Sequence, residues 1–219
     1  EGSGAGAGAD RHQSATKDFT EWRERGILAE DKTPGLYLYT QRFTLPTGEE
    51  LARSGFIALV KLEDAGAGVK GHENTLAASL PLEDRFKLLS ATSANLSQVF
   101  ALYRDSERVL DKALDEKRGE PVFNFRTADG IYHALSYITD AATIALVQKR
   151  LANESLIVAD GHHSYETALR YRNEQRKKYP EAGPDASFEY MTMFLCNTSD
   201  PGLQILPTHR LLPKDTPFD

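Results

Sequence analysis

The turn at residues 160–163, with the sequence Asp-Gly-His-His, combines a carboxylate, a glycine and two imidazoles. It follows an apolar run at 156–159, and it precedes a pattern in which Tyr165, Leu169 and Arg172 recur at helical spacing. These features predict a buried strand, a tight turn and a helix. Unpaired backbone N–H groups and the positive end of the helix would then lie beside side chains that can move protons or bind a cation.

Each residue of this turn has a candidate role. Asp160 can hold a divalent cation through oxygen, and Gly161 permits a positive φ or a close backbone approach. His163 can transfer a proton, and His162 lies on another face of the helix with apolar side chains. In the alternative interpretation, Asp160 only caps the helix and His162 packs in the core.

A second polar segment, Gly-His-Glu-Asn-Thr at 71–75, contains His72 and Glu73. Glu73 can act as a general base or as a cation ligand. The pair resembles the start of the HExxH zinc-protease motif, but Leu76 stands where the second histidine is needed, so that motif is absent. The alternative for Glu73 is a solvated loop acid.

Three further residues are candidates for contact with an anion. His209 and Arg210 lie in a Pro-Thr-His-Arg sequence where a strand is predicted to leave the sheet, and Arg85 lies in a predicted helix. Arginine suits bidentate contact with phosphate or carboxylate. We expect the segments that contain His72 and His209 to converge on the turn at 160–163. The alternatives are that His209 and Arg210 are an ordinary surface pair and that Arg85 is only the neighbour of a helix-start acid.

The composition narrows the classes of function. The chain has 219 residues, 40% of them hydrophobic, a formal charge of −6 and a pI of about 5.6. This charge does not predict nucleic-acid binding, and we interpret the basic residues at 170–178 as the solvated face of a helix. No run approaches the roughly 18 apolar residues of a membrane span, and the single cysteine excludes an internal disulfide. We expect a cytoplasmic protein without a membrane segment.

The pattern of apolar runs and turn residues predicts an α/β fold of the α+β kind, with a mixed sheet and flanking helices. Residues 1–9 are predicted to be a flexible terminal segment, and 10–219 to be one mixed α/β domain, a fragment of a longer chain. Helices are predicted at 11–25, 81–91, 105–118, 140–152 and 162–179. Strands are predicted at 36–43, 55–62, 99–103, 121–126, 131–138, 156–159 and 188–196, with another beginning at 203.

Six motifs in this order resemble a known family. They are LYLYTQRF, GFIALVKLED, GHENT, PLEDRFKLL, LIVADGHHSYETALRY and LQILPTHRLL. Through these motifs the chain resembles, from about residue 10 to residue 212, the bacterial and archaeal family catalogued as domain of unknown function 1015. Members of that family are often labelled ParB- or SpoOJ-like.

The Asp-Gly-His-His turn also resembles the box shared by ParB, sulfiredoxin and the free-serine kinases. This resemblance implies a ParB/sulfiredoxin-like core, nucleotide phosphates bound at 160–163, magnesium held by Asp160, and an acid elsewhere acting as base, for which Glu73 is a candidate. Ser164 stands where the common pattern has arginine. Either Arg85, Arg170 or Arg210 substitutes for that guanidinium, or phosphate affinity is reduced, or the ligand differs.

The leading hypothesis is a nucleotide-dependent phosphotransferase or nucleotide hydrolase that acts on a small hydroxylated metabolite. Its cofactors would be Mg²⁺ and a nucleotide, namely ATP, ADP or CTP. The predicted catalytic residues are Asp160, His163, Glu73 and His72, with Asp160 and Glu73 as metal ligands. The predicted nucleotide-binding residues are Gly161, His162, Ser164, Arg85, His209 and Arg210. Two alternatives are a non-catalytic nucleotide-sensing or partition-type binding module and a metal-dependent hydrolase.

Overall fold

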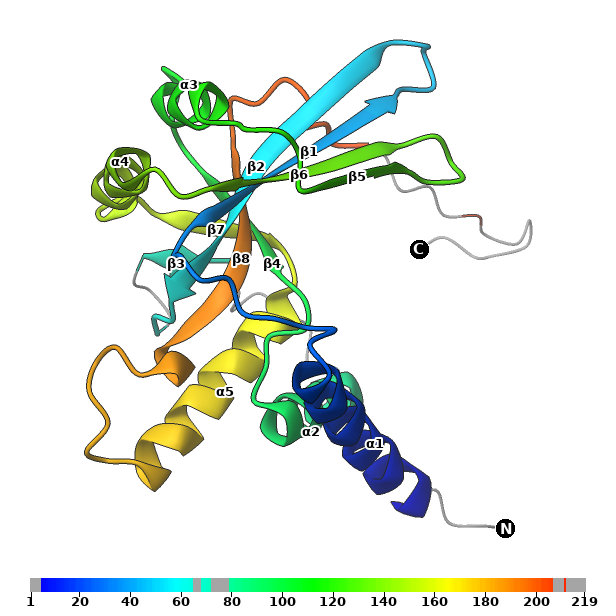
Figure 1. Ribbon diagram of the computed structural model, residues 1–219, viewed down its shortest axis with the longest axis vertical. Coiled ribbons are helices and arrows are strands. Elements are labelled where there is room, and N and C mark those ends of the chain that lie inside the picture. Colours follow the sequence, from blue (N-terminus) through cyan, green and yellow to red (C-terminus); the bar gives the residue numbers. More distant parts are fainter. Residues whose placement is uncertain (1–4, 65–67, 72–78, 207–210, 212–219) are drawn as a thin grey trace, which may run out of the picture.

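The computed structural model describes residues 5–64, 68–71, 79–206 and 211; of these, the side chains at 5–10 and 79–81 are not described. The described residues form one eight-stranded mixed sheet and five α-helices (Figure 1). The mixed α/β class predicted from the sequence is confirmed. None of the helices in the described part of the chain is long and apolar enough to cross a membrane.

The sheet has the strand order β3-β7-β4-β8-β2-β1-β6-β5. Two pairs, β3 with β7 and β4 with β8, are parallel, and the other neighbours are antiparallel. The strands are β1 (Leu36–Thr44), β2 (Glu50–Lys61), β3 (Val69–Lys70), β4 (Val99–Tyr103), β5 (Phe123–Arg126), β6 (Tyr132–Ile138), β7 (Leu156–Asp160) and β8 (Tyr190–Asn197).

The two hairpins predicted from turn residues are confirmed. The turn after β1 closes with a 2.8 Å hydrogen bond from the N–H group of Leu45 to the carbonyl of Glu49, and β2 follows. The Asp-Gly turn at 129–130 joins β5 to β6. The strand predicted to begin at 203 is wrong for residues 203–206, which form no strand, and the short strand β3 was not predicted.

The helices are α1 (Ala5–Glu24), α2 (Ser79–Thr92), α3 (Val109–Glu116), α4 (Ala141–Leu151) and α5 (His162–Lys178). α2 packs against both α5 and α1, and Figure 1 shows these three helices at one end of the molecule with α3 and α4 at the other. α1 begins within the segment predicted to be flexible, and α3 is shorter than the predicted 105–118. Asp140 caps α4 as its sequence suggests, because its side chain accepts a 2.9 Å hydrogen bond from the N–H group of Thr143.

α5 is anchored to the chain that follows β2. The Tyr165 hydroxyl exchanges 3.0 Å hydrogen bonds with the backbone of Glu63, and Nη1 of Arg172 donates to the carbonyl of Leu62 at 2.8 Å. Tyr165 is fully buried and Arg172 is 2% exposed. The basic residues at 170–178 were predicted to lie mostly on a solvated face, and Arg172 is an exception. Because these contacts fix the helix, they also fix its N-terminus relative to the sheet.

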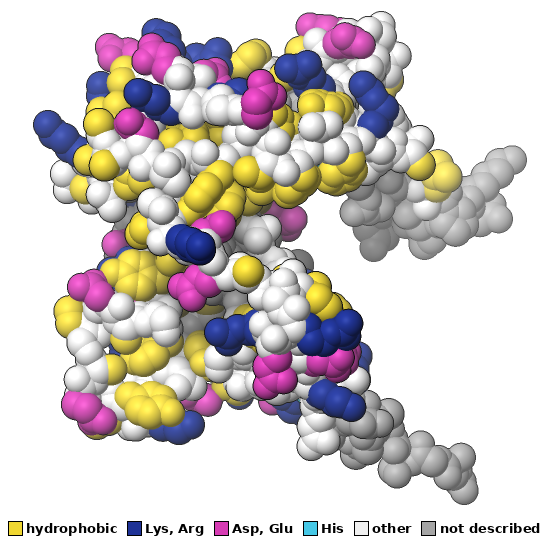
Figure 2. Space-filling model, in the orientation of Figure 1, with side chains coloured by type: hydrophobic (Ala, Val, Ile, Leu, Met, Phe, Trp, Pro, Cys, Tyr) yellow, Lys and Arg dark blue, Asp and Glu magenta, His cyan; other side chains and the backbone are white. Residues whose placement is uncertain are grey.

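The surface carries charges of both signs. On the face shown in Figure 2, the side chains of Lys and Arg are interspersed with those of Asp and Glu. This face therefore offers no extended basic surface of the kind that neutralises a nucleic-acid backbone.

Candidate functional site

The predicted strand, turn and helix are confirmed, but the strand is not fully buried, because Ile157 is exposed between the buried Leu156 and Val158. The turn depends on a glycine. β7 ends at Asp160, and α5 begins at His162. Gly161 between them has a φ of +86°, which L side chains rarely adopt. A Cβ atom here would also lie 3.2 Å from the Cα of Val99 in β4. The N–H group of Gly161 donates a 2.8 Å hydrogen bond to the exposed side chain of Asp160.

The first turn of α5 leaves two backbone amides available. The N–H groups of Ser164 and Tyr165 donate to the carbonyl of Gly161 at 2.9 and 3.0 Å. The amides of His162 and His163 find no acceptor among the described residues. Such amides, together with the helix dipole, favour an anion at this position.

A guanidinium group reaches the same helix end from α2. Nη1 of Arg85 donates a hydrogen bond to Oγ of Ser164. Ser164 is the residue that stands where the resembled turn has arginine, so a positive charge from another helix lies beside the position of the missing one. Arg85 itself is exposed and can contact a bound anion.

Arg170, a second candidate for this role, is engaged elsewhere. It donates a 2.7 Å hydrogen bond to Glu83, and its guanidinium lies 3.6 Å from the centre of the Phe86 ring. The hydrogen bond from Arg170 lowers the pKa of the Glu83 carboxyl. These contacts join α5 to α2, the helix that carries Arg85. Arg170 therefore does not take the place of the missing arginine at the turn.

The two imidazoles of the turn are half-buried. Nδ1 of His163 is a buried atom that has no hydrogen-bond partner in the structure described, whereas the His163 carbonyl accepts a 2.6 Å hydrogen bond from Thr167. An unpaired ring nitrogen beside an anion site can exchange a proton with a ligand or bind it.

Only one of the two predicted magnesium ligands lies among the described residues. Asp160 supplies one exposed carboxylate at the turn. Within the described ranges, no three His, Cys, Asp or Glu side chains are grouped so that they could hold a metal ion. The predicted second ligand, Glu73, lies outside the described residues, so the pairing of these two acids stays a prediction.

His72 lies outside the described residues together with Glu73, but the chain on both sides of their segment is described. It enters the segment from β3, where Lys70 pairs with Ile157 of β7. It leaves the segment into α2, which carries Arg85. Both flanks of the segment therefore lie next to the strand–turn–helix.

His209 and Arg210 also lie outside the described residues. The chain that leads to them leaves the sheet from the carboxyl end of β8, next to the carboxyl end of β4. Asp160 instead pairs with Phe100, near the amino end of β4. The convergence of His209 and Arg210 on the turn stays a prediction.

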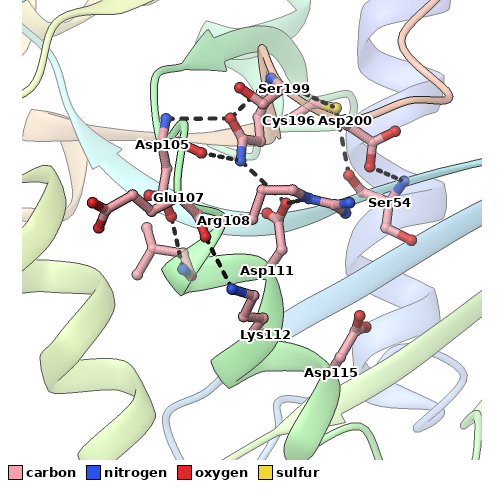
Figure 3. A network of polar contacts seen from close by, with 12 residues as sticks. Ser54, Asp105, Glu107, Arg108, Asp111, Lys112, Asp115, Cys196, Ser199 and Asp200 are labelled. Carbon is pink, nitrogen blue, oxygen red and sulfur yellow. Dashed lines mark hydrogen bonds and ion pairs between the residues drawn. The ribbon is translucent and has the colours of Figure 1, made fainter.

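A second polar cluster, not recognised from the sequence, lies at the carboxyl ends of β4 and β8 (Figure 3). Asn197 is fully buried, and its Nδ2 donates to the carbonyl of Asp105 at 2.8 Å and to Asp111 at 3.1 Å. Asp111 also accepts hydrogen bonds from the Tyr103 hydroxyl at 3.0 Å and from Nε of Arg108 at 2.7 Å. Burial raises the pKa of Tyr103, which keeps this hydroxyl a donor.

The sequence contains only part of the information that is needed to predict this cluster. Polar residues follow both strands directly in the sequence, and ligands in α/β proteins often bind outside the carboxyl ends of neighbouring parallel strands. The pairing of β4 with β8 joins segments far apart in the chain, so no local pattern indicates that these residues meet.

The described residues form a mixed α/β fold in which a strand, a glycine turn and a helix follow one another at β7 and α5. The sequence matches the family described as "Protein of unknown function (DUF1015)" over residues 2–219, and the chain belongs to this family. The comparisons with curated proteins and with solved structures gave no match. The ParB/sulfiredoxin-like core therefore stays a prediction.

Proposed function

We propose that this domain binds the phosphates of a nucleotide at the N-terminus of α5 and uses the nucleotide as a phosphotransferase or hydrolase. A small hydroxylated metabolite would be the phosphoryl acceptor. The observation that carries the proposal is the contact between Arg85 and Ser164, made beside a helix end whose first amides have no acceptor in the described structure.

The free energies of the possible contacts show why the guanidinium group of Arg85 matters for binding. A helix N-terminus contributes about 0.3–1 kcal/mol to binding an anion at an exposed site. A hydrogen bond to a charged group contributes about 1.5–3 kcal/mol. The amides of His162 and His163 would orient a phosphate, and Arg85 would add a charge-assisted hydrogen bond to it. The Ser164 hydroxyl, which accepts from Arg85, keeps its own hydrogen for a phosphate oxygen.

The other proposed roles follow from position. Asp160 would hold Mg²⁺, which when bound neutralises charge on the phosphates. His163 would accept or donate the proton, since its Nδ1 lies unpaired at the turn. Glu73 and His72 are proposed as the acid–base residues from the segment between β3 and α2. Arg210 is proposed to stabilise charge on the leaving group.

Isothermal titration of the full chain with ATP, ADP and CTP, each with Mg²⁺, tests binding. We expect Arg85→Ala to weaken nucleotide binding by about tenfold or more, because one charge-assisted hydrogen bond is lost. Lys87→Ala is the matched control, since Lys87 is an exposed cation on the same helix. An absence of nucleotide binding by the unmodified chain, or equal losses in the two variants, contradicts the proposal.

Product analysis separates catalysis from sensing. Release of ADP or phosphate from bound ATP supports an enzyme, whereas binding without turnover indicates a nucleotide-sensing module that uses the same turn. A partition-type DNA binder predicts instead salt-dependent binding to duplex DNA. A metal-dependent hydrolase would need His162 and His163 on one ion, but consecutive helical residues project about 100° apart because a turn holds 3.6 residues.

A further inference from the structure

A polar cavity of about 360 Å³ lies between the β1–β2 hairpin and α3. It is separate from the turn at Gly161, because it borders Tyr103 at the carboxyl end of β4 whereas the turn lies near the amino end of that strand. A cavity of this volume suits a small polar metabolite. Its charged lining consists of Arg42, Arg108, Arg118, Asp111, Asp115 and Asp200.

Arg108 presents one edge of its guanidinium group to this cavity in a fixed orientation. Its Nε donates to Asp111, which the buried cluster at the strand ends holds in place. No described residue accepts a hydrogen bond from the two terminal nitrogens of Arg108. Figure 3 shows the guanidinium extending from α3 toward Ser54 and Asp200. A planar guanidinium held through Nε offers its other edge to a carboxylate.

Asp200 is a buried carboxylate that makes no ion pair within the described part of the chain. It is 6% exposed and accepts hydrogen bonds only from backbone N–H groups, those of Gly202 at 2.8 Å and Ser54 at 3.2 Å. Gly202 packs so closely on β2 that a Cβ atom would overlap the carbonyl of Ala52. Burial raises the pKa of Asp200, and the nearby charge of Arg108 opposes that rise only in part.

The remaining charged side chains of the cavity lining are one ion pair and one arginine that has no ion-pair partner among the described residues. Arg118 forms an ion pair with Asp115. Arg42 lies 5.6 Å from the centre of the Tyr132 ring and makes no ion pair with any described residue. Arg108 pairs with Asp111, so Arg42 and Asp200 are the two charged side chains of the lining that form no ion pair with a described residue.

We propose that this cavity binds a small zwitterionic metabolite of the α-amino acid class. The carboxylate of the ligand would accept hydrogen bonds from the free edge of Arg108 and face the charge of Arg42, and its ammonium group would donate to Asp200. A simple anion would leave the buried Asp200 near a like charge, and a simple amine would leave Arg42 unmatched. The proposal does not rest on nucleotide binding at α5.

Calorimetry of the full chain with matched probes tests the ligand class. The probes are glycine, alanine and serine, their hydroxy-acid counterparts glycolate and lactate, ethylamine, and inorganic phosphate. At least one amino acid is expected to bind, and the other probes to bind about tenfold more weakly or worse. Equal binding of a hydroxy acid, tighter binding of phosphate, or no binding of any of the three amino acids overturns the proposal.

Substitutions then locate the bound ligand. Arg42→Ala and Asp200→Asn are each expected to weaken amino-acid binding by about tenfold or more. Arg104→Ala, an exposed cation that precedes α3, is the control and should leave the affinity unchanged. Circular dichroism verifies folding, and if Asp200→Asn does not fold, the exposed Arg42 decides the outcome. Unchanged affinity in Arg42→Ala overturns the proposal.

Discussion

Arg85 and Ser164 are hydrogen-bonded although 79 positions separate them in the chain. Because α2 packs on α5, the guanidinium arrives at the helix end where the resembled turn carries its own arginine. The departure at Ser164 is thus accompanied by a cation from another helix, which supports the proposed anion site.

The turn itself should be intolerant of a side chain. Gly161→Ala is expected to lower the free energy of unfolding by about 1–2 kcal/mol, because an L residue pays that cost in the left-handed region. The close approach to Val99 adds to it. Gly183→Ala is the control, since a Cβ atom there meets nothing within 4 Å. Urea denaturation measures both, and an equal effect at the two sites contradicts the account of the turn.

The buried arginine of α5 should contribute to stability. Arg172→Met keeps much of the apolar stem but leaves the carbonyl of Leu62 without its donor, and a buried unsatisfied group costs about 1–3 kcal/mol. We expect a loss of that size in chemical denaturation. Lys177→Met, an exposed residue on the same helix, should change stability little. A stable Arg172→Met variant would show that this anchor is dispensable.

Acid should remove the stabilisation provided by Glu189. Arg176 donates two hydrogen bonds to this carboxylate, at 2.7 and 2.6 Å, and holds its pKa below the ordinary 4.5. The folded state therefore binds this proton less tightly than the unfolded state. The resulting stability is present above pH 4.5 and is lost as the pH falls through the lowered folded pKa.

Urea denaturation between neutral and acidic pH tests this dependence. Glu189→Gln should be less stable than the unmodified chain at neutral pH, and the difference should shrink in acid. Glu181→Gln, at an exposed position, is the control and should follow the unmodified chain at every pH. A stability difference that stays constant with pH would show that ionisation of Glu189 does not stabilise the fold.

The single thiol should be unreactive in the folded protein. Cys196 is fully buried, and burial raises its pKa to about 12, so the thiolate that reacts with disulfide reagents is scarce. A thiol titration with a chromogenic disulfide is expected to give no colour until urea unfolds the chain. Rapid reaction of the native protein would contradict the burial of this thiol.

Local patterns in the sequence were sufficient for the local parts of the structure. The apolar run before Asp160 and the helical spacing after it predicted β7 and α5, and the side chain of Asp140 predicted the start of α4. These features depend on neighbours in the chain, whose periodicity and capping chemistry can be read directly.

The parts that depend on packing between distant segments were not predictable in this way. The helical spacing places Arg172 on the same face as Tyr165 and Leu169, but its acceptor, the carbonyl of Leu62, lies 110 positions away in the chain. Arg85 was a candidate anion contact, but its approach to Ser164 depends on how α2 packs on α5. The cluster around Asn197 depends on the pairing of β4 with β8.

The most direct test of the central claim is to map where a nucleotide binds. Titration of isotope-labelled protein with ATP and Mg²⁺, followed by amide NMR, reports each backbone N–H group separately. The account predicts the largest shifts at the amides of residues 161–164, with a smaller change at Arg85. Amide shifts confined to residues that line the cavity between the β1–β2 hairpin and α3, or no shifts at millimolar nucleotide, would contradict it.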